Sequence, residues 1–371
     1  MKTFELSVCL LALAMFVTGC RENSNDAVVE NGDGQANVAD AAESELDKDG
    51  YFPVFDSDYG QNTISNRMQK NFTNFYNTED ESEFLHLKSA GLKIYQPENL
   101  PVTEKFTGFL STEAGASVIV LTSPFSMEKT ISQIVADSIS GGRTGILYRR
   151  EIEIDGRQGV FYLVRETLAG GYVTKCITAF GNDEFSWIVT GTFNAELEAD
   201  FGEEILKTLL NIKVAEEERL PPGEDVDFTI ESNGRLVITD GFVDKVVFTL
   251  TGKFPGEITN KEPVFQVGKS LVKFDVENRK QVASRLISPT PAFRIDLVSS
   301  EREMKVNGLD GFEFVSIGTD ISTDEQLVIY SAILFSEETG YVIHGWASSA
   351  NETSYVSDFR ALTESFKLKE K

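Results

Sequence analysis

Two short stretches decide the fold, IEIDGRQGVF at residues 152–161 and MKVNGLDGFE at residues 304–313. Each places an Asp-Gly or Asn-Gly pair between segments in which apolar and polar residues alternate. This pattern is the strongest short-range signal for a β-hairpin closed by a two-residue turn. In both stretches a second glycine follows three residues after the first. We therefore interpret them as the same hairpin in two copies of one structural unit.

The similarity between the two copies continues downstream. WIVTG at residues 187–191 matches YVIHG at residues 341–345, and each is followed by an asparagine that can cap a helix, Asn194 and Asn351. Apolar residues then fall at helical spacing: Leu197, Phe201, Ile205, Leu209 and Ile212 in the first copy, and Tyr355, Phe359, Leu362 and Phe366 in the second. Each copy should therefore end in a helix that packs on its sheet.

The segments upstream of the hairpins are less alike. In the first copy, residues 117–122 predict a buried strand, and Met127, Ile131, Ile134, Val135 and Ile139 mark a helix. The corresponding part of the second copy, residues 271–276 with Val282 and Leu286, is less regular. A repeat period of roughly 150 residues indicates two domains in tandem, because solenoid units are several times shorter.

Each copy thus reads as an early strand, a helix, a meander of strands and a C-terminal helix. This layout resembles the PsbP-like superfamily over residues 90–215 and 226–368, with FTGF at residues 106–109 and the hairpin residues Ile154, Gly156 and Gly159 in the first copy. The resemblance implies an α+β fold in which an antiparallel sheet is flanked by helices. It also implies a binding or scaffolding module, since the superfamily shares no catalytic residues that could be transferred.

We expect two domains joined by a short linker. Residues 51–215 form the first domain with an N-terminal helical extension, and residues 226–371 form the second. Residues 216–225, EEERLPPGED, combine a charge run with a Pro-Pro-Gly breaker and suit a linker. In the extension, an apolar helical face made by Ile64, Met68, Phe72 and Phe75 either packs on the first domain or contacts a partner.

The N-terminus has the features of an export signal. The apolar run at residues 6–17 is too short for a permanent membrane span but fits the core of a signal peptide. It ends in Val17, Thr18, Gly19 and Cys20, which is similar to the lipobox of bacterial lipoproteins. Residues 1–19 are thus a predicted signal peptide, with Val17, Thr18 and Gly19 recognised by the signal peptidase and Cys20 lipidated. The alternatives are an ordinary secretory signal with a chance cysteine, and a core helix.

An acidic segment follows the cysteine. Residues 21–58 hold eleven acidic and two basic side chains, and we interpret residues 20–50 as a disordered tether. The whole chain of 371 residues has 34 basic and 59 acidic side chains, a net charge of −25. Nucleic acid or an anionic lipid surface would be repelled by this charge and is not expected as the main partner.

Few residues point to catalysis or to metal binding. The two histidines, His86 and His344, fall in separate predicted segments, and neither completes a Ser-His-Asp arrangement. No zinc-ligand spacing occurs, and the DKDG sequence at residues 47–50 is an incomplete calcium loop. The glycines of residues 140–145 end a helix and do not form a phosphate loop. Cys176 is predicted to be a buried small side chain in a strand. We expect no cofactor and no metal.

These observations predict a non-enzymatic protein of the bacterial cell envelope. It would be anchored by Cys20, face the periplasm and bind another envelope protein, and Arg21 after the cysteine favours the outer membrane. The alternative is a carrier or sensor of a small hydrophobic ligand held between sheet and helix, with Phe180, Phe185, Trp187 and Phe193 as lining residues. An envelope enzyme is the weakest alternative. The sequence assigns no ligand-binding residue.

Overall fold

The computed structural model describes residues 84–140, 144–168, 171–254, 262–270, 278–287, 293–321, 323–337 and 339–370. The predicted signal peptide, tether and helical extension lie outside these ranges. The predicted elements at residues 271–276 lie outside them as well.

The first half of the described chain is built on a six-stranded antiparallel sheet in the order β3-β4-β8-β7-β6-β5. Its strands are β3 (Gly108–Ser111), β4 (Ala116–Ser123), β5 (Thr144–Ile154), β6 (Arg157–Leu168), β7 (Gly171–Gly181) and β8 (Ser186–Asn194). Helix α3 (Met127–Ser140) connects β4 to β5, and α4 (Glu198–Leu210) follows β8. A smaller sheet pairs β1 (Phe84–Leu87), β2 (Leu92–Tyr95) and β9 (Ile212–Val214).

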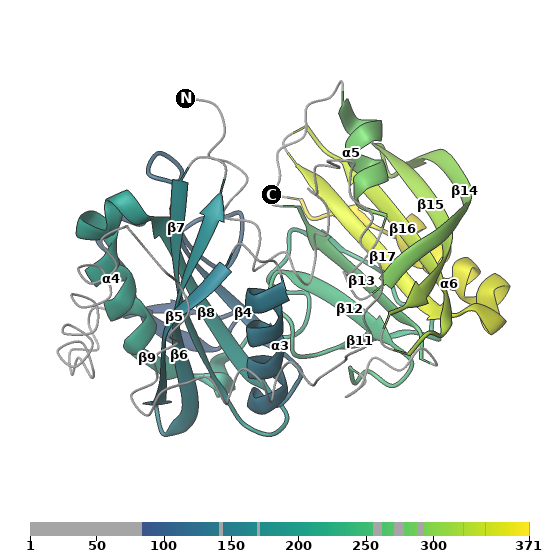
Figure 1. The fold of residues 1–371 in the computed structure, drawn as a ribbon. Helices are drawn as coiled ribbons and strands as arrows, with labels where there is room; N and C mark the ends of the chain where they lie inside the picture. The colour runs from purple at the N-terminus through teal and green to yellow at the C-terminus, as the bar shows by residue number, and fades with distance from the viewer. Residues whose placement is uncertain are drawn as a thin grey trace, which may run out of the picture.

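The second half is built on a separate seven-stranded sheet in the order β11-β12-β13-β17-β16-β15-β14. Its strands are β11 (Val237–Thr239), β12 (Lys245–Thr249), β13 (Val264–Lys269), β14 (Phe293–Val306), β15 (Leu309–Asp320), β16 (Gln326–Phe335) and β17 (Gly340–Ser348). Helix α5 (Arg279–Arg285) precedes β14, and α6 (Glu352–Glu364) follows β17. Strands β10 (Phe228–Thr229) and β18 (Lys367–Leu368) pair apart from this sheet. Figure 1 shows the two sheets as neighbouring bodies.

The two halves repeat the same order of elements. Strand β4, helix α3, strands β5 to β8 and helix α4 correspond to β13, α5, β14 to β17 and α6. Even the short strands after the last helices correspond, because β9 pairs with β2 and β18 pairs with β10. The predicted α+β arrangement of antiparallel sheets with few helices is confirmed, and the two separate sheets partly support the predicted pair of tandem domains.

The two diagnostic hairpins have the expected turns. Asp155 and Gly156 join β5 to β6 with φ of +47° and +77°, and Asn307 and Gly308 join β14 to β15 with φ of +47° and +91°. A two-residue turn of type I′ requires positive φ at both positions, which Asp, Asn and Gly tolerate better than other residues. The local sequence therefore fixes the register of both long hairpins.

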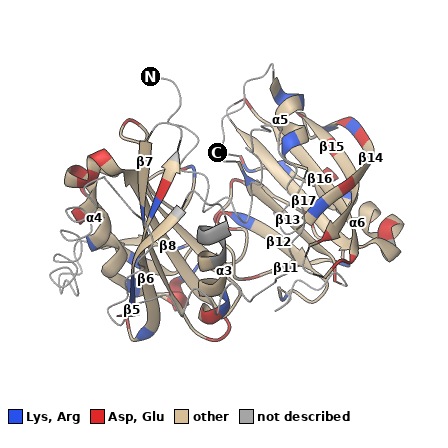
Figure 2. Ribbon diagram, in the orientation of Figure 1, with Lys and Arg blue, Asp and Glu red and all other residues tan. Residues whose placement is uncertain are grey.

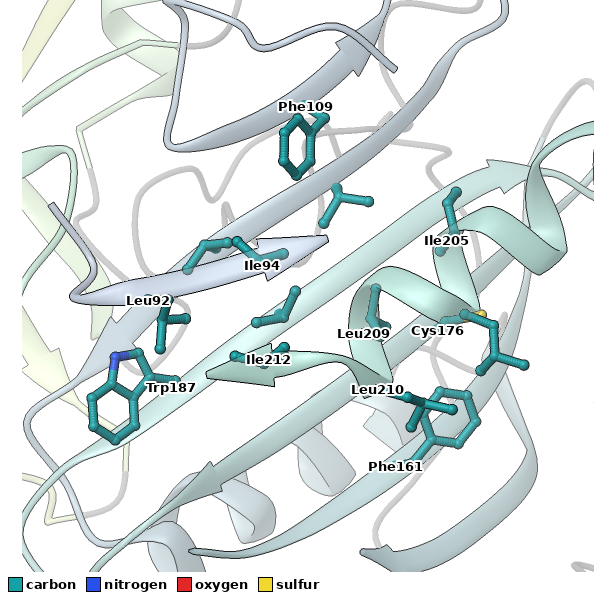
Figure 3. Close-up of a cluster of buried hydrophobic side chains, with 14 of the residues drawn as sticks. Leu92, Ile94, Phe109, Phe161, Cys176, Trp187, Ile205, Leu209, Leu210 and Ile212 are labelled. Atoms are coloured by element: carbon teal, nitrogen blue, oxygen red, sulfur yellow. The ribbon is translucent and has the colours of Figure 1, made fainter. Parts of the chain in front are cut away.

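Successive side chains along the strands of the first half point to opposite faces of the sheet, so they pack into two separate cores. Phe161, Leu163 and Cys176 face α4, and they pack with its residues Ile205 and Leu209 (Figure 3). The intervening residues of the same strands, including Tyr162, Val164 and Ile177, face α3 instead. Each buried side chain of this size contributes about 1.5 to 3 kcal/mol. The sheet thus lies between two helices, as the resemblance implied.

Two details of the predicted helices are wrong. Helix α4 ends at Leu210, where Asn211 leaves helical geometry, and Ile212 lies in β9 opposite Ile94. Likewise Phe366 lies beyond α6, although it is fully buried. Asn194 caps as predicted, since its side chain accepts a hydrogen bond from the Glu196 amide. Asn351 directly precedes α6, and the short turn that contains it begins after Ser348.

A loop of the second half contacts the first half. We call residues 240–244 the junction loop. Both the amide and the hydroxyl of Thr107 donate hydrogen bonds to the Asp244 carboxylate, at 2.6 and 2.9 Å. Thr122 Oγ1 donates to the Gly241 carbonyl at 2.8 Å, and Val243 is buried in the α4 core of the first half. The two halves are therefore joined by packing as well as by the chain.

The segment at residues 216–225 is bonded to both halves. The Leu220 amide donates to the Lys88 carbonyl at 3.0 Å, and Arg219 pairs with Asp240 of the junction loop at 2.9 Å. On the other side, the Asp225 carboxylate accepts a hydrogen bond from the Asp244 amide. Its role as the boundary between two domains stays a prediction.

Candidate functional site

The lipidation residue and its recognition sequence lie outside the described residues. Cys20, Val17, Thr18 and Gly19 therefore stay sequence predictions. Within the described ranges, no helix is long and apolar enough to cross a membrane. The same part of the chain holds no group of three His, Cys, Asp or Glu side chains arranged to bind a metal ion.

The two histidines lie in different halves. His86 is on β1, with Nδ1 at 3.4 Å from a Glu218 carboxylate oxygen. His344 is on β17 with no exposed surface, and its Nδ1 lies 3.1 Å from Ser331 Oγ. Because Ser331 donates its hydroxyl hydrogen to the Ile287 carbonyl, the His344 ring donates from Nδ1. Burial lowers the pKa of His344 to about 3. A neutral ring sealed from solvent is a poor acid or base.

Cys176 is fully buried in β7, as predicted. Burial, and to a lesser extent the Glu198 carboxylate, raise the pKa of its thiol far above the usual range. Such a thiol forms little thiolate, so Cys176 acts as a small apolar side chain.

The aromatic residues considered for a ligand pocket pack mainly on one another. Phe180 stacks on Trp187 with ring centroids 5.4 Å apart, and Phe185 meets Trp187 edge-on at 4.8 Å. Phe193 is buried in the same core. Trp187 Nε1 also donates to the Ala90 carbonyl at 2.8 Å. These contacts account for all four residues as core of the first half.

The most exposed strand in either large sheet is β14. Residues 296–303 are exposed without a break, on both faces of the strand. Leu297 and Val298 stand out, because their side chains are 60% and 41% exposed. Among the described strands β14 pairs only with β15, so it forms an edge of the seven-stranded sheet. We call residues 293–306 the β14 edge.

The β14 edge is irregular and charged. Its pairing with β15 shifts register between Ile295 and Leu297 and again between Val298 and Ser300. Acidic and basic residues both occur along the strand (Figure 2). Bulges and charges are the usual means of keeping an exposed edge from pairing indiscriminately with other chains.

A buried carboxylate anchors the β14 edge to the rest of its domain. Arg302 of β14 donates two hydrogen bonds to Glu313 of β15, at 2.9 and 2.8 Å. Arg360 of α6 donates to the same carboxylate at 2.8 Å, and the Tyr330 hydroxyl donates at 3.2 Å. Burial alone would raise the Glu313 pKa, but these arginines hold it below its usual range. The network links β14 to β15, β16 and α6 through one carboxylate.

Other edges are less suited to binding. In the first half β5 occupies the position of β14, but Ile152 and Ile154 are buried and most of its other residues are only partly exposed. The opposite edge of the second sheet, β11, exposes Val237 and Ile238 at 38% and 40% but is three residues long. The β14 edge therefore combines length and exposure as neither of the others does.

The sequence predicts no binding role for the β14 edge. The available signal was LVSSERE at residues 297–303, which breaks the alternation expected of a strand with one buried face. Because alternation is the sequence signal of a strand with one buried face, a strand exposed on both faces is not predicted from it.

Comparisons with known proteins give similar structures only. No family model matches the chain, and no curated protein is detectably similar to it.

Three similar solved structures have low sequence identity to this chain. LpqN from Mycobacterium tuberculosis, described as involved in cell envelope biogenesis, is 9% identical, with 38% of this chain and 83% of LpqN covered and a TM-score of 0.28. The cyanobacterial PsbP of Synechocystis sp. PCC 6803 is 9% identical, with 35% and 91% covered and a TM-score of 0.28. The type VI secretion immunity protein TplEi of Pseudomonas aeruginosa is 11% identical, with 79% and 99% covered and a TM-score of 0.27. TM-scores this low assign no function.

Proposed function

We propose that this chain is a lipid-anchored, non-enzymatic protein of the bacterial cell envelope that binds another protein through the β14 edge. The observation that carries the proposal is the continuous exposure of residues 296–303 on a long sheet edge, with Leu297 and Val298 exposed at its centre. An extended segment of a partner would add to this edge as a further strand.

The chemistry of the edge suits strand addition. The backbone groups on the side of β14 that no described strand pairs with can supply hydrogen bonds that do not depend on the partner's sequence, and side chains on the two faces supply specificity. Leu297 and Val298 would each be covered by an apolar side chain of the added strand. The net charge of −25 favours a partner of opposite charge, mainly by raising the rate of association.

The burial of the two candidate catalytic side chains, His344 and Cys176, supports a non-enzymatic role. His344 and Cys176 are both fully buried, and burial holds each in its neutral form. Neither residue reaches solvent, where a substrate would arrive.

The anchor is proposed from the sequence. Cys20 follows Val17, Thr18 and Gly19, and the acidic residues 20–50 would hold the folded body away from the lipid headgroups. We propose a periplasm-facing location, with the outer membrane favoured over the inner.

The binding proposal is tested by photo-crosslinking in cells. A photoreactive phenylalanine analogue is placed at Leu297, and the matched control carries it at Ile238 on the opposite edge of the same sheet. We expect one dominant crosslinked protein at Leu297 and none at Ile238. With the partner purified, Leu297→Lys together with Val298→Lys should weaken its affinity at least about tenfold, the cost of burying unpaired charge in an apolar contact.

The control pair is Val237→Lys with Ile238→Lys, which adds the same charge to the β11 edge. Unchanged affinity in the control and a loss at β14 would support the proposal. Equal loss in both pairs, or crosslinks at Ile238 alone, would place binding elsewhere.

The anchor has a separate test. Cells grown with a labelled fatty acid should incorporate label into the wild-type protein and none into Cys20→Ala, which should also leave the membrane fraction or stay as a precursor. Full processing and membrane binding of Cys20→Ala would refute lipidation at this residue.

A further inference from the structure

A second feature of interest, besides the β14 edge, is centred on Arg165 and lies on the large sheet of the first half. Arg165 of β6 lies directly between Gly145 of β5 and Thr174 of β7 in the register of the sheet. This row is on the α4 side, because Phe193, opposite Thr174 on β8, is part of the α4 core. Gly145 has no side chain, so one side of the guanidinium has no neighbouring side chain from β5 in this row.

The buried hydrogen-bond donors of Arg165 and Thr174 have no acceptor. Arg165 Nε and Nη2 are buried, and neither makes a hydrogen bond. The Thr174 residue has no exposed surface, and its Oγ1 also lacks a partner. No carboxylate in the described part of the chain forms an ion pair with Arg165. Buried polar groups in folded proteins are nearly always paired, and charged donors are the most costly to leave unpaired.

The opposite face of the same strands provides an internal comparison. Glu166 and Lys175, each adjacent in sequence to a member of the row, form a buried ion pair at 2.5 Å. Their side chains are 9% and 3% exposed. The chain thus pairs the buried charges on one face and leaves the arginine on the other face without an anion.

Tyr172 forms the boundary between this row and solvent. The guanidinium carbon of Arg165 lies 5.8 Å from the centre of the Tyr172 ring, and the tyrosine is 42% exposed. Tyr172 is two residues before Thr174 on the same face of β7.

We propose that Arg165 and Thr174 form a binding site for a carboxylate. All the unpaired groups named above can donate hydrogen bonds, so the missing group is an acceptor. The Nε and Nη2 edge of a guanidinium matches the two oxygens of a carboxylate in a bidentate pair. The Thr174 hydroxyl adds a third donor beside it. The site is in the first half and does not depend on the β14 proposal.

A carboxylate has two possible sources, a small organic acid and a polypeptide. The probes are sodium acetate, a short peptide with a free C-terminal carboxylate, the same peptide as its amide, and sodium sulfate as an anion of other geometry. The measurement is the NMR signal of the Arg165 Nε–H in the folded protein, because a bidentate carboxylate shifts this proton downfield. Tighter binding of acetate than of the peptide identifies a small acid as the ligand type, and the reverse identifies a polypeptide.

Two variants test whether binding requires the bidentate geometry of the guanidinium or only its positive charge. Arg165→Lys keeps the charge but loses the two-pronged geometry and the Arg165 side-chain signal, so acetate binding to wild type and to this variant is compared through the backbone amide signals of the neighbouring Gly145 and Thr174. The variant should bind acetate at least about tenfold more weakly. Thr174→Val keeps the shape of the side chain without the hydroxyl and should weaken binding severalfold. The matched control, Arg149→Lys on the neighbouring β5, should leave binding unchanged. Circular dichroism and melting temperature confirm that each variant is folded.

Three results would overturn the proposal. The first is the absence of a saturable shift of the Arg165 signal with acetate and with the free peptide. The second is equal binding by wild type and Arg165→Lys. The third is an equal, non-saturating response to acetate and sulfate, which would indicate general ionic effects only. None of these results bears on partner binding at β14, which is measured separately.

Discussion

His344 is the clearest case of a single residue whose environment decides its chemistry. It lies between Gln266 and Ser331 in a row that crosses the second sheet, and it has no exposed surface. Burial lowers its pKa to about 3, whereas an unfolded histidine titrates near 6.5. Between these two pH values the unfolded chain binds a proton that the native chain does not. Stability contributed by the neutral ring is therefore lost as pH falls from about 6.5 towards 3.

The lowered pKa of His344 predicts a loss of stability on acidification that the variant His344→Gln should not show. Between pH 7 and pH 5, His344 should cost the wild type about 2 kcal/mol of unfolding free energy, and His344→Gln should not show this loss. Urea denaturation of both proteins at the two pH values measures the difference. His86→Gln, which changes the other histidine, is the control and should retain the loss. An identical pH dependence in wild type and His344→Gln would mean that the native ring takes up a proton without cost.

At the scale of elements, two glycines determine how closely the C-terminal helices approach their sheets. A Cβ at Gly191 would lie 2.1 Å from Ile205 Cγ2 of α4, and a Cβ at Gly345 would lie 2.6 Å from the Phe359 ring of α6. The two glycines occupy matching positions in WIVTG and YVIHG. The repeat in sequence thus reflects a repeated packing requirement.

We expect Gly345→Ala to destabilise the second half by about 1 to 3 kcal/mol, the usual cost of overpacking a core. Gly318 is not used as the control, because a Cβ there would also be too close to its neighbours. The control is Gly308→Ala, because a Cβ at Gly308 would meet nothing within 4 Å. Its φ of +91° makes that control a measure of backbone strain alone. Chemical denaturation gives both values.

A second substitution identifies the contact responsible. If the clash with Phe359 is the cause, adding Phe359→Leu to Gly345→Ala should cost less than the sum of the two single changes. Strict additivity would show that the alanine acts in some other way.

The parts of the fold that local sequence determines were predicted, and those set by distant contacts were not. The turns at Asp155-Gly156 and Asn307-Gly308 need positive φ, and this requirement is visible in two adjacent letters. The three-residue spacing of Ile212 from Leu209 predicts a helix, but pairing with Ile94, more than a hundred residues away, places Ile212 in a strand. Arg165 gave no signal, because its missing acceptor becomes apparent only when β5, β6 and β7 are in register.

At the scale of the whole molecule, the junction loop couples the two halves. Asp244 accepts two hydrogen bonds from Thr107, and burial raises its pKa to about 6 although these bonds oppose the increase. Val243 completes the α4 core of the first half. Interfaces between domains of one chain are often loose, but here side chains of one half are buried among those of the other. The two halves should therefore unfold together despite having separate sheets.

Gly241 allows this coupling to be tested. A Cβ at this position would lie 3.2 Å from Pro124 Cβ and 3.6 Å from the Phe185 ring, both in the first half. Gly241→Leu should therefore force the loop away from the first half. Gly234→Leu is the matched control, since Gly234 has a similar positive φ, +78° against +100°, but its Cβ would meet nothing within 4 Å.

Differential scanning calorimetry distinguishes coupled from independent unfolding. The wild type should give one transition with equal van't Hoff and calorimetric enthalpies. Gly234→Leu should lower the melting temperature and keep a single transition, because it strains one loop without touching the junction. Gly241→Leu should split the transition in two, as each half then melts at its own temperature. Two transitions in the wild type, or the same profile for both variants, would mean that the junction contacts are too weak to couple the halves.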